Sequence, residues 1–272
     1  MSRELLSETK FYNSKDNCLL YVKSKASDIY WDNHWNSDNL KRDIQESQSP
    51  LVVKYTKKYL TRASKLLEGG CGKGQNVYLL NKLGFRVVGI DYAEGTVRSI
   101  NSCMPELDIR LGDVRRLPFE DDSFNGYWSL GVIEHFYEGY QPIMSEMYRV
   151  LKPGGILFMT VPTMSFMRKA KSKLGLYPKW SNNPVEIDNF YQFALDPNLI
   201  ITNFQNNGFK LIEKKPYDGF KGFKDEVGFL RGLLQSIYDS SFILNKIFRK
   251  IVDLLTVKFS SHMTLFIFKK IK

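Results

Sequence analysis

The sequence contains very little cysteine and histidine. Its three cysteines, Cys18, Cys71 and Cys103, are odd in number and form no CxxC pair, so they indicate neither a disulfide framework nor a zinc ribbon. The three histidines, the cysteines and the acidic residues form no group with the spacing of metal ligands. We therefore expect a reducing, cytoplasmic environment and no bound metal.

Long apolar segments are also missing. No stretch of 18 apolar residues occurs, and the N-terminal segment lacks the apolar run of a signal peptide. There is no internal repeat or low-complexity tract, and glycine (19) and proline (10) are at ordinary levels. These absences predict a chain that neither spans a membrane nor forms a solenoid or a fibre.

The sequence does contain enough apolar residues for a core, and its charge is unevenly distributed. The 272 residues are 43% hydrophobic, which suffices for one large domain or two small ones without disulfides. Residues 1–162 carry 21 basic and 20 acidic side chains, whereas residues 163–272 carry 18 and 9. Residues 1–162 are nearly neutral, whereas residues 163–272 are predicted to bind an anionic substrate or partner.

Residues 65–162 alternate short apolar runs with longer amphipathic ones. This alternation predicts a parallel sheet covered by helices. The predicted strands are Lys65–Glu68, Arg86–Ile90, Asp108–Leu111, Gly126–Leu130 and Ile156–Val161. The predicted helices are Gln75–Leu83, Ala93–Cys103 and Tyr140–Leu151. The sequence KPGG at residues 152–155 is predicted to end the last helix, because proline cannot continue it and glycine accepts a positive φ.

Further elements are predicted on both sides of this region. Ser49 and Pro50 are a typical N-cap and first residue of a helix. Residues 206–215 are predicted to form a turn and a strand, and residues 262–270 a final strand. Between them, apolar residues from 225 to 257 recur at spacings near three and four. That spacing predicts one long helix or two consecutive helices. Residues 163–189 show no period, hold the basic run MRKAKSKLGLYPKW and are predicted to be an insertion or a mobile cover.

The most informative segment is a glycine-rich turn between a strand and a helix, LLEGGCGKGQ at residues 66–75. Its glycines let the backbone approach a ligand closely, and the helix after it presents unpaired N–H groups. A phosphate-binding P-loop is excluded, because Lys73 is followed by Gly74 and the motif's first glycine would fall on Leu67. A dinucleotide fingerprint is weakened by Gln75 in the place of its third glycine but stays open, as does a tight turn without a ligand.

Carboxylates follow the next two predicted strands. Asp91 ends the strand VVGID, 23 residues after Glu68, where it can accept hydrogen bonds from both hydroxyls of a ribose. It can also cap the helix that starts near Ala93, and the two roles are compatible. Asp113 comes just after the third strand, where it could hold an adenine amino group.

Four segments in this order resemble the class I S-adenosylmethionine-dependent methyltransferases, in particular the group that includes ubiquinone-biosynthesis-like enzymes. The segments are LLEGGCGKG, VVGIDYAE, GDVRRLPFEDDSFNGYWSLGVIEHF and EMYRVLKPGGILFMTVP. The resemblance implies a Rossmann-like, doubly wound α/β fold with a seven-stranded, mostly parallel sheet whose last strand is antiparallel. In that sheet, residues 262–270 would lie beside residues 156–161. The chain departs from the family pattern at Glu68, where aspartate is commoner, and at Asn125, which replaces an acid.

The resemblance also implies S-adenosyl-L-methionine as the cofactor, and it assigns roles to residues. The first-strand acid and the glycine loop would hold the methionine end, and the second-strand acid and the tyrosine after it would hold the ribose and one adenine face. The residues after the third strand would read the adenine edge, and the end of the fourth strand would face the methyl group. The implied residues are Glu68, Gly69, Gly70, Cys71, Gly72, Gly74, Gln75, Asp91, Tyr92, Asp113, Val114, Leu130 and Gly131.

Two further groups are candidates for the acceptor side. His135 lies just beyond the fourth strand, so it could act as a general base for a hydroxyl acceptor, or it could merely shape the pocket. An N-terminal aromatic cluster could close over the cofactor and contact substrate, or it could pack against the edge of the sheet. The cluster consists of Tyr30, Trp31, His34 and Trp35.

These observations predict how the chain is divided. Residues 1–48 would form an aromatic cap and residues 49–272 a methyltransferase domain. Within that domain, residues 65–162 would bind the cofactor, residues 163–190 would form a basic insertion or lid, and residues 191–272 would complete the sheet. The predicted function is in-line methyl transfer to a small or lipid-linked, anionic acceptor. An RNA-directed methyltransferase or an NAD-type nucleotide-binding protein stays open as the alternative.

The amphipathic segment at residues 225–257 carries more apolar side chains than a covering helix needs. It is therefore predicted to contact a membrane peripherally or to form a homodimer. Nucleic acid is the less favoured partner, because MRKAKSKLGLYPKW mixes aromatic and basic residues without a recognisable binding module.

Overall fold

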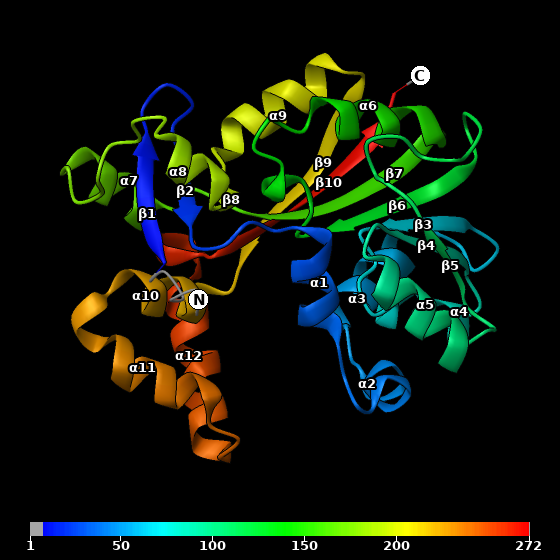
Figure 1. Cartoon of the computed structure of the whole chain (residues 1–272), viewed down its shortest axis with the longest axis horizontal. Helices are drawn as coiled ribbons and strands as arrows, with labels where there is room; N and C mark the ends of the chain where they lie inside the picture. The colour runs from blue at the N-terminus through cyan, green and yellow to red at the C-terminus, as the bar shows by residue number, and fades with distance from the viewer. Residues whose placement is uncertain (1–7, 272) are drawn as a thin grey trace.

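The computed structural model describes residues 8–271 and is organised around a seven-stranded sheet (Figure 1). The strands are β3 (Lys65–Gly69), β4 (Arg86–Asp91), β5 (Asp108–Leu111), β6 (Phe124–Leu130), β7 (Leu151–Pro162), β9 (Phe209–Tyr217) and β10 (Met263–Lys270). They lie in the order β5-β4-β3-β6-β7-β10-β9, and β3 to β7 pair in parallel. Strand β10 runs antiparallel to both β7 and β9. The predicted Rossmann-like sheet with an antiparallel last strand is confirmed.

Helices cover both faces of this sheet, as a doubly wound fold requires. One layer contains α3 (Pro50–Tyr59), α4 (Gln75–Lys82) and α5 (Glu94–Cys103), and the other contains α6 (Gln141–Val150) and α9 (Pro197–Asn206). Side chains of β6 alternate between the two layers. Tyr127 packs in the α6 and α9 layer, whereas Trp128 packs in the other and stacks on Phe158. The central strands are thus buried on both faces, which explains their almost continuous apolar sequence.

Strand β7 begins earlier than the sequence predicts. Helix α6 ends at Val150, as expected, but β7 starts at the next residue. Phe124 pairs with Leu151, and Gly126 pairs with Ile156. The KPGG sequence is therefore an irregularity inside the strand and not a loop before it, and Gly154 at φ +76° provides the conformation it needs.

A second, three-stranded sheet lies beside the first, and the sequence patterns do not predict it. It consists of β1 (Thr9–Asn13), β2 (Cys18–Val22) and β8 (Phe190–Ala194), with β2 in the middle and all pairs antiparallel. Strand β2 is buried along its whole length. The pairing joins the N-terminal segment to a strand far along the chain. Two helices follow β2, namely α1 (Asp28–Trp35) and α2 (Leu40–Glu46).

Helices also occupy the two regions that carry most of the basic excess. They are α7 (Phe166–Lys173), α8 (Pro184–Asp188), α10 (Gly219–Glu226), the 3-10 helix η2 (Gly228–Leu230), α11 (Arg231–Asp239) and α12 (Ile243–Ser260). The region 225–257 therefore forms consecutive helices, as predicted. No helix between residues 8 and 271 is long and apolar enough to cross a membrane.

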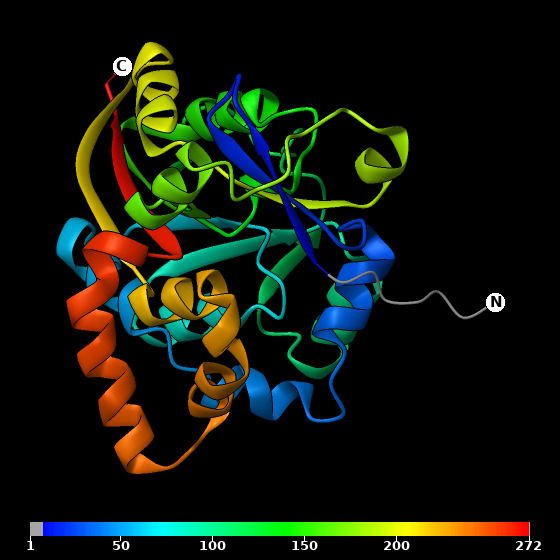
Figure 2. The ribbon, with the colours of Figure 1, turned by 90° about the vertical axis from the view of Figure 1, so that its left-hand side faces the viewer.

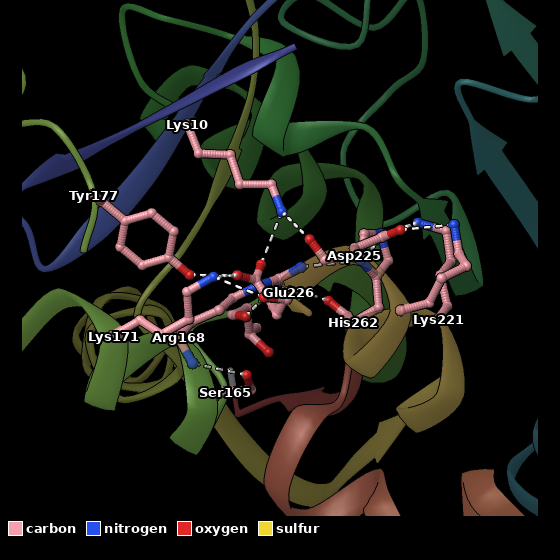
Figure 3. A network of polar contacts seen from close by, with 11 residues as sticks. Lys10, Ser165, Arg168, Lys171, Tyr177, Lys221, Asp225, Glu226 and His262 are labelled. Carbon is pink, nitrogen blue, oxygen red and sulfur yellow. Dashed lines mark hydrogen bonds and ion pairs between the residues drawn. The ribbon is translucent and has the colours of Figure 1, made fainter. Parts of the chain in front are cut away.

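A buried network of charges ties the covering elements together (Figure 3). Glu226, at the end of α10, lies 2.9 Å from Lys10 Nζ of β1 and 2.7 Å from Lys171 Nζ of α7. Arg168 of α7 is fully buried and places its Nε 3.2 Å from the same carboxylate, and Tyr177 donates its hydroxyl to it at 2.5 Å. The small sheet and helices α7 and α10 are thus fixed to one another by a single carboxylate.

Candidate active site

The carboxyl ends of four parallel strands bring the predicted cofactor residues to one edge of the sheet. Glu68 lies near the end of β3, Asp91 ends β4, and Leu130 ends β6 just before Gly131. Asp113 comes two residues after β5. In open α/β sheets, ligands bind outside the carboxyl ends of the strands. The fold therefore gathers these residues where a ligand would be expected.

The loop after β3 has the backbone that its glycines predict. Gly70, Gly72 and Gly74 have φ angles of +74°, +50° and +72°. The N–H groups of Gly70 and Cys71 donate to the carbonyl oxygen of Ile90 at 2.8 and 3.1 Å, and α4 begins directly after the loop. The first turn of α4 consequently presents its free N–H groups beside the loop.

Glu68 is a buried carboxyl group with one oxygen left over. Its Oε1 accepts a hydrogen bond from Asn76 Nδ2 at 2.7 Å, whereas Oε2 has no hydrogen-bond partner. Burial raises the pKa of Glu68 to about 8, although the hydrogen bond from Asn76 acts in the opposite direction. A buried acceptor without a partner is costly, so this oxygen suits a ligand that brings a donor, such as an ammonium group.

Asp91 holds the glycine loop and does not cap the next helix. Its Oδ2 accepts from the Gly72 N–H at 2.8 Å, and its Oδ1 accepts from the Ala93 N–H at 3.0 Å. Ala93 itself occupies the N-cap position of α5, so the interpretation of Asp91 as the N-cap is wrong. Burial raises the pKa of Asp91, and the backbone N–H groups oppose that rise. Each carboxylate oxygen keeps a second lone pair that a ribose hydroxyl can use.

The carboxylate that caps α5 comes from α1, and the sequence patterns missed it. Asp32 accepts from the backbone N–H groups of Gly95 and Thr96 at 3.2 and 2.7 Å, and from the Thr96 hydroxyl at 2.8 Å. It thereby satisfies the free donors in the first turn of α5. This contact fixes α1 over the carboxyl edge of the sheet. No local signal could reveal it, because the two partners lie far apart in the sequence.

The residues predicted to bind adenine lie at the same edge and already have partners within the protein. Tyr92 donates its hydroxyl to the carbonyl oxygen of Ala26 at 2.9 Å. Asp113 accepts from Arg115 Nη2 at 2.6 Å; partial burial raises the pKa of Asp113, but Arg115 lowers it by more. Val114 is buried in the core. A cofactor would have to share or replace the two polar contacts.

Glu134 is a second buried carboxyl group at this edge, and the sequence reasoning did not single it out. It lies in the 3-10 helix η1 (Ile133–His135) and is 1% exposed. Its Oε2 has no hydrogen-bond partner, and its Oε1 would lie 3.4 Å from a Cβ placed on Gly131. Burial raises the pKa of Glu134 to about 8. The only signal in the sequence is its place between the end of β6 and His135.

His135 has the geometry of a neutral, weak base. Its Nδ1 lies 2.7 Å from the carbonyl oxygen of Tyr191 in β8. Because a carbonyl only accepts, Nδ1 carries the proton and Nε2 keeps its lone pair. Burial lowers the pKa of His135 to about 4, although the contact with Tyr191 favours protonation. The ring is therefore neutral at pH 7.

The aromatic residues of α1 cover this site. The ring of Trp31 meets that of His135 edge-on, with centroids 5.1 Å apart. The ring of Trp35 lies so close to the loop that a Cβ on Gly72 would be 2.9 Å from it. Ring contacts connect the whole cluster of Tyr30, Trp31, His34 and Trp35. The structure thus brings all four predicted acceptor residues to the carboxyl edge of the sheet.

The described part of the chain has no other group of residues that suggests a catalytic site. No cluster of three or more His, Cys, Asp or Glu side chains able to hold a metal ion occurs in the described part of the chain. A hollow of about 700 Å³ lies at the opposite edge of the sheet, where Lys65, Arg86 and Asp108 begin their strands. That hollow is remote from the glycine loop and from both unpaired carboxyl groups.

Comparison with known proteins identifies the class of this site. The family described as "Methyltransferase domain" matches residues 67–159, from the middle of β3 to near the end of β7. The chain therefore carries a domain of the class I S-adenosylmethionine-dependent methyltransferase family, whose cofactor is S-adenosyl-L-methionine.

Individual relatives agree with this assignment. A protein of Mycolicibacterium smegmatis named as an S-adenosylmethionine-dependent methyltransferase is 39% identical over 97 residues, which are 36% of this chain and 37% of that protein. The chain thus matches little more than a third of that relative's length. A demethylmenaquinone methyltransferase of Staphylococcus carnosus is 26% identical over 217 residues, which are 72% of this chain and 90% of that protein.

The fold extends beyond the matched segments. The crystal structure of the cyclase SpnF superposes with a TM-score of 0.56 at 16% identity. The superposed region covers 91% of this chain and 97% of the SpnF chain. At that identity the likeness shows the fold alone. Because SpnF is named as a cyclase, the fold by itself does not fix the reaction, and the function has to be argued from the site.

Proposed function

We propose that the protein transfers the methyl group of S-adenosylmethionine, in line, to a small or lipid-linked acceptor that carries negative charge. The observation that carries this proposal is the free buried oxygen of Glu68 beside a loop with three glycines at positive φ. Such a loop admits a ligand close to the backbone, and the carboxyl group matches an ammonium group.

The residues at the carboxyl edge would share the work of holding the cofactor. Glu68 would bind the ammonium group, Asp91 would accept from the ribose hydroxyls, and the backbone at Leu130 and Gly131 would face the methionyl sulfur. When bound, S-adenosylmethionine supplies a methyl carbon whose bond to sulfur breaks, with its electron pair, as the acceptor's lone pair forms the new bond. The protein's contribution is then to orient the acceptor and to exclude water.

Helix α1 would form the acceptor side of the site. Its aromatic rings lie between the glycine loop and His135, where they can exclude water and contact an acceptor. Because the ring of Trp35 presses against Gly72, α1 would have to shift when the cofactor enters. Quenching of tryptophan fluorescence by S-adenosylhomocysteine, lost in a Trp35→Phe variant, is the expected sign of this shift.

His135 would act as the general base for a hydroxyl acceptor. Its neutral ring has a lone pair on Nε2, and general-base catalysis typically contributes about 100-fold or more to a rate. We expect His135→Ala to lose turnover by that factor while binding S-adenosylhomocysteine normally. A His135→Ala enzyme with near-normal turnover would reduce the role of this residue to shaping the pocket.

Two observations support a lipid-linked or anionic acceptor. A relative that matches 72% of this chain is named a demethylmenaquinone methyltransferase, and that name describes a quinone with a lipid tail. The basic excess of residues 163–272 lies outside the cofactor loop, in the part of the chain that we expect to select the acceptor. RNA stays the alternative acceptor, for which the basic run in and after α7 is the supporting feature.

The division of the chain follows the same logic. We infer that residues 65–162 bind the cofactor, that residues 1–48 and 163–190 cover the acceptor side, and that residues 191–272 complete the sheet. A cytoplasmic location is supported by the free thiols of Cys18, Cys71 and Cys103, which form no disulfide.

Transfer of radiolabelled methyl groups tests the acceptor class. The protein is incubated with methyl-labelled S-adenosylmethionine and a cell extract, which is then separated into RNA, water-soluble small molecules and solvent-extractable lipids. We expect label in acidic small molecules or lipids, and much less label with Glu68→Gln when the cofactor is not saturating. Label in RNA would support the alternative, and label in uncharged acceptors would contradict the predicted charge. Calorimetric binding of NAD in place of S-adenosylhomocysteine would overturn the proposal as a whole.

A further inference from the structure

Helix α12 exposes most of its apolar side chains, unlike an ordinary surface helix. Two of its polar side chains instead face α10, since Asp253 Oδ1 accepts from the Phe220 N–H at 3.1 Å and Ser260 Oγ donates to the Gly219 carbonyl oxygen at 2.9 Å. The exposed apolar side chains lie on the other side of the helix. They include Leu254 and Leu255, which are 77% and 75% exposed. The outward set is Ile243, Leu244, Ile247, Phe248, Ile251, Leu254, Leu255 and Phe259.

The packing against α10 fixes this orientation. A Cβ on Gly222 would lie 1.6 Å from the carbonyl oxygen of Ser260, and a Cβ on Gly219 would lie 2.5 Å from the backbone nitrogen of Val257. The two glycines therefore let the backbones of α10 and α12 touch along one face of α12. Rotation of α12 to bury its leucines would break this contact, so the outward apolar face belongs to the folded structure.

The elements before α12 enlarge the same kind of surface. Phe229 in η2 is 88% exposed, Leu233 in α11 is 62% exposed, and Phe242 just before α12 is 58% exposed. We define the outward set of α12 together with these three side chains as the α11–α12 face. Eight exposed apolar side chains along one helix, with three more on the segment before it, are more than a folded protein usually leaves without an interaction partner.

The excess of basic side chains around the α11–α12 face indicates that its partner is anionic. Residues 228–260 contain five basic side chains and only two acidic ones, and the acidic Asp253 points into the protein. Lys246, Lys250 and Lys258 are exposed on α12 itself. Cationic side chains beside an apolar face are typical of helices that lie on anionic membranes. A second copy of this surface would instead bring like charges together.

The topology attaches the α11–α12 face to the carboxyl edge of the sheet. The segment that holds these helices leaves the sheet after Tyr217 and returns at Met263, and both residues lie level with Pro162 at the carboxyl end of β7. Figures 1 and 2 show α11 and α12 projecting from the sheet on the side opposite α9. The face is thus carried by the same edge of the sheet as the glycine loop.

We propose that the α11–α12 face docks on an anionic lipid bilayer, with α12 lying along the membrane surface. Leucine, isoleucine and phenylalanine side chains enter the headgroup boundary, and the lysines meet acidic headgroups. The inference deepens the proposed function, because docking would let the site reach a lipid-borne acceptor. The docking itself requires no catalysis, so it can be measured separately.

Vesicle co-sedimentation of the full chain tests the proposal. We expect binding to phosphatidylcholine vesicles that contain about 30% phosphatidylserine, weaker binding to pure phosphatidylcholine, and release by high salt. Leu254→Glu/Leu255→Glu should lower binding more than tenfold. Lys246→Gln/Lys250→Gln should lower it by about fivefold per lysine on the anionic vesicles only. Leu174→Glu/Leu176→Glu is the matched control, because these leucines are 73% and 61% exposed elsewhere, and it should bind like the wild type.

Two companion measurements separate the outcomes. Light scattering after size exclusion should show a monomer. The proposal would be overturned in favour of a second copy if the wild type formed a dimer and did not bind vesicles, and if Leu254→Glu/Leu255→Glu dissociated that dimer. Equal vesicle binding by the wild type and that variant would also overturn it. S-adenosylhomocysteine binding should be unchanged in all these variants. Vesicle binding without S-adenosylhomocysteine binding would contradict the proposed function and leave the docking intact.

Discussion

Glu226 and the pair Glu68 and Glu134 are two contrasting kinds of buried carboxyl group. Glu226 is surrounded by donors (Figure 3), and although burial raises its pKa, Lys10, Arg168 and the hydrogen bonds lower it to about 2. Glu68 and Glu134 are equally buried, but each keeps an oxygen without a partner, and burial raises the pKa of each to about 8. One kind is a saturated ionic junction, and the other is an unsaturated polar group.

The difference separates structure from function. Glu226 joins β1, α7 and α10, so its full set of partners serves to hold the covering elements in place. Most of the buried side-chain atoms without partners in the described part of the chain lie instead around the glycine loop and the ends of β3 and β6. These are atoms of Glu68, Gln75, Asn76, Ser129 and Glu134. A folded protein keeps such atoms where a ligand completes their hydrogen bonds.

The largest predicted effect comes from breaking the saturated junction. Glu226→Gln leaves the buried Arg168 without its counter-charge, so we expect the free energy of unfolding to fall by about 3–5 kcal/mol. Urea denaturation followed by circular dichroism measures this change. Glu46→Gln, which removes an exposed pair with Arg42, should cost less than about 1 kcal/mol. A Glu226→Gln protein as stable as the wild type would show that the junction is not structural.

The second effect is on binding and comes from the unsaturated carboxyl group. Glu68→Gln should weaken binding of S-adenosylhomocysteine by about 10- to 100-fold, because a charge-assisted hydrogen bond contributes about 1.5–3 kcal/mol. Near pH 4.5, where the raised pKa of Glu68 does not yet reduce stability, the unfolding free energy should change by less than about 1 kcal/mol, in contrast to Glu226→Gln. Glu94→Gln, at an exposed carboxylate near the site, serves as the control for calorimetry. Unchanged affinity in Glu68→Gln would remove this residue from the cofactor site.

The two kinds of carboxyl group also predict opposite responses to pH. The folded-state pKa values of Glu68 and Glu134 are raised, so the unliganded protein should lose stability as pH rises from about 4.5 to 8, by up to about 1.4 kcal/mol per pH unit for each group. The folded-state pKa of Glu226 is depressed, so its contribution is lost as pH falls from about 4.5 to 2. Urea denaturation at several pH values measures these changes. Between pH 4.5 and 8, the free energy of unfolding should fall less steeply in Glu68→Gln and in Glu134→Gln than in the wild type. Equal slopes in the wild type and both variants would contradict the raised pKa values.

The smallest predicted change concerns His135. Because burial lowers its pKa to about 4, its ring should stay neutral between pH 5.5 and 8, with the proton on Nδ1. Nitrogen-15 spectra of the histidine rings report both properties, and the His135→Ala protein assigns the signals. A titration of His135 near pH 6.5 would show that the ring is open to water and that α1 does not cover it.

The sequence alone predicts the central sheet well. The strands and helices of residues 65–162 have short, regular periods, and glycines 70, 72 and 74 adopt the positive φ angles that the loop requires. These features are local, so composition and spacing reveal them. The order of the motifs then supplies the topology, including the antiparallel strand β10 beside β7.

The contacts that complete the site are not local, and the sequence does not reveal them. Strand β2 finds its partner β8 far along the chain, and Asp32 caps a helix that belongs to the central domain. Glu134 is an ordinary acidic residue in the sequence, and only the three-dimensional packing shows that its carboxyl group is buried without a partner. Such features depend on burial, which spacing does not report.

Proton release on cofactor binding tests the central claim most directly. S-adenosylhomocysteine is titrated into the protein at pH 7 in two buffers that differ in ionisation enthalpy. The raised pKa of Glu68 means that the carboxyl group is mostly protonated before binding and ionises when it meets the ammonium group. We predict binding with release of nearly one proton, and no release in Glu68→Gln. Binding without proton release in the wild type, or no binding at all, would contradict the account.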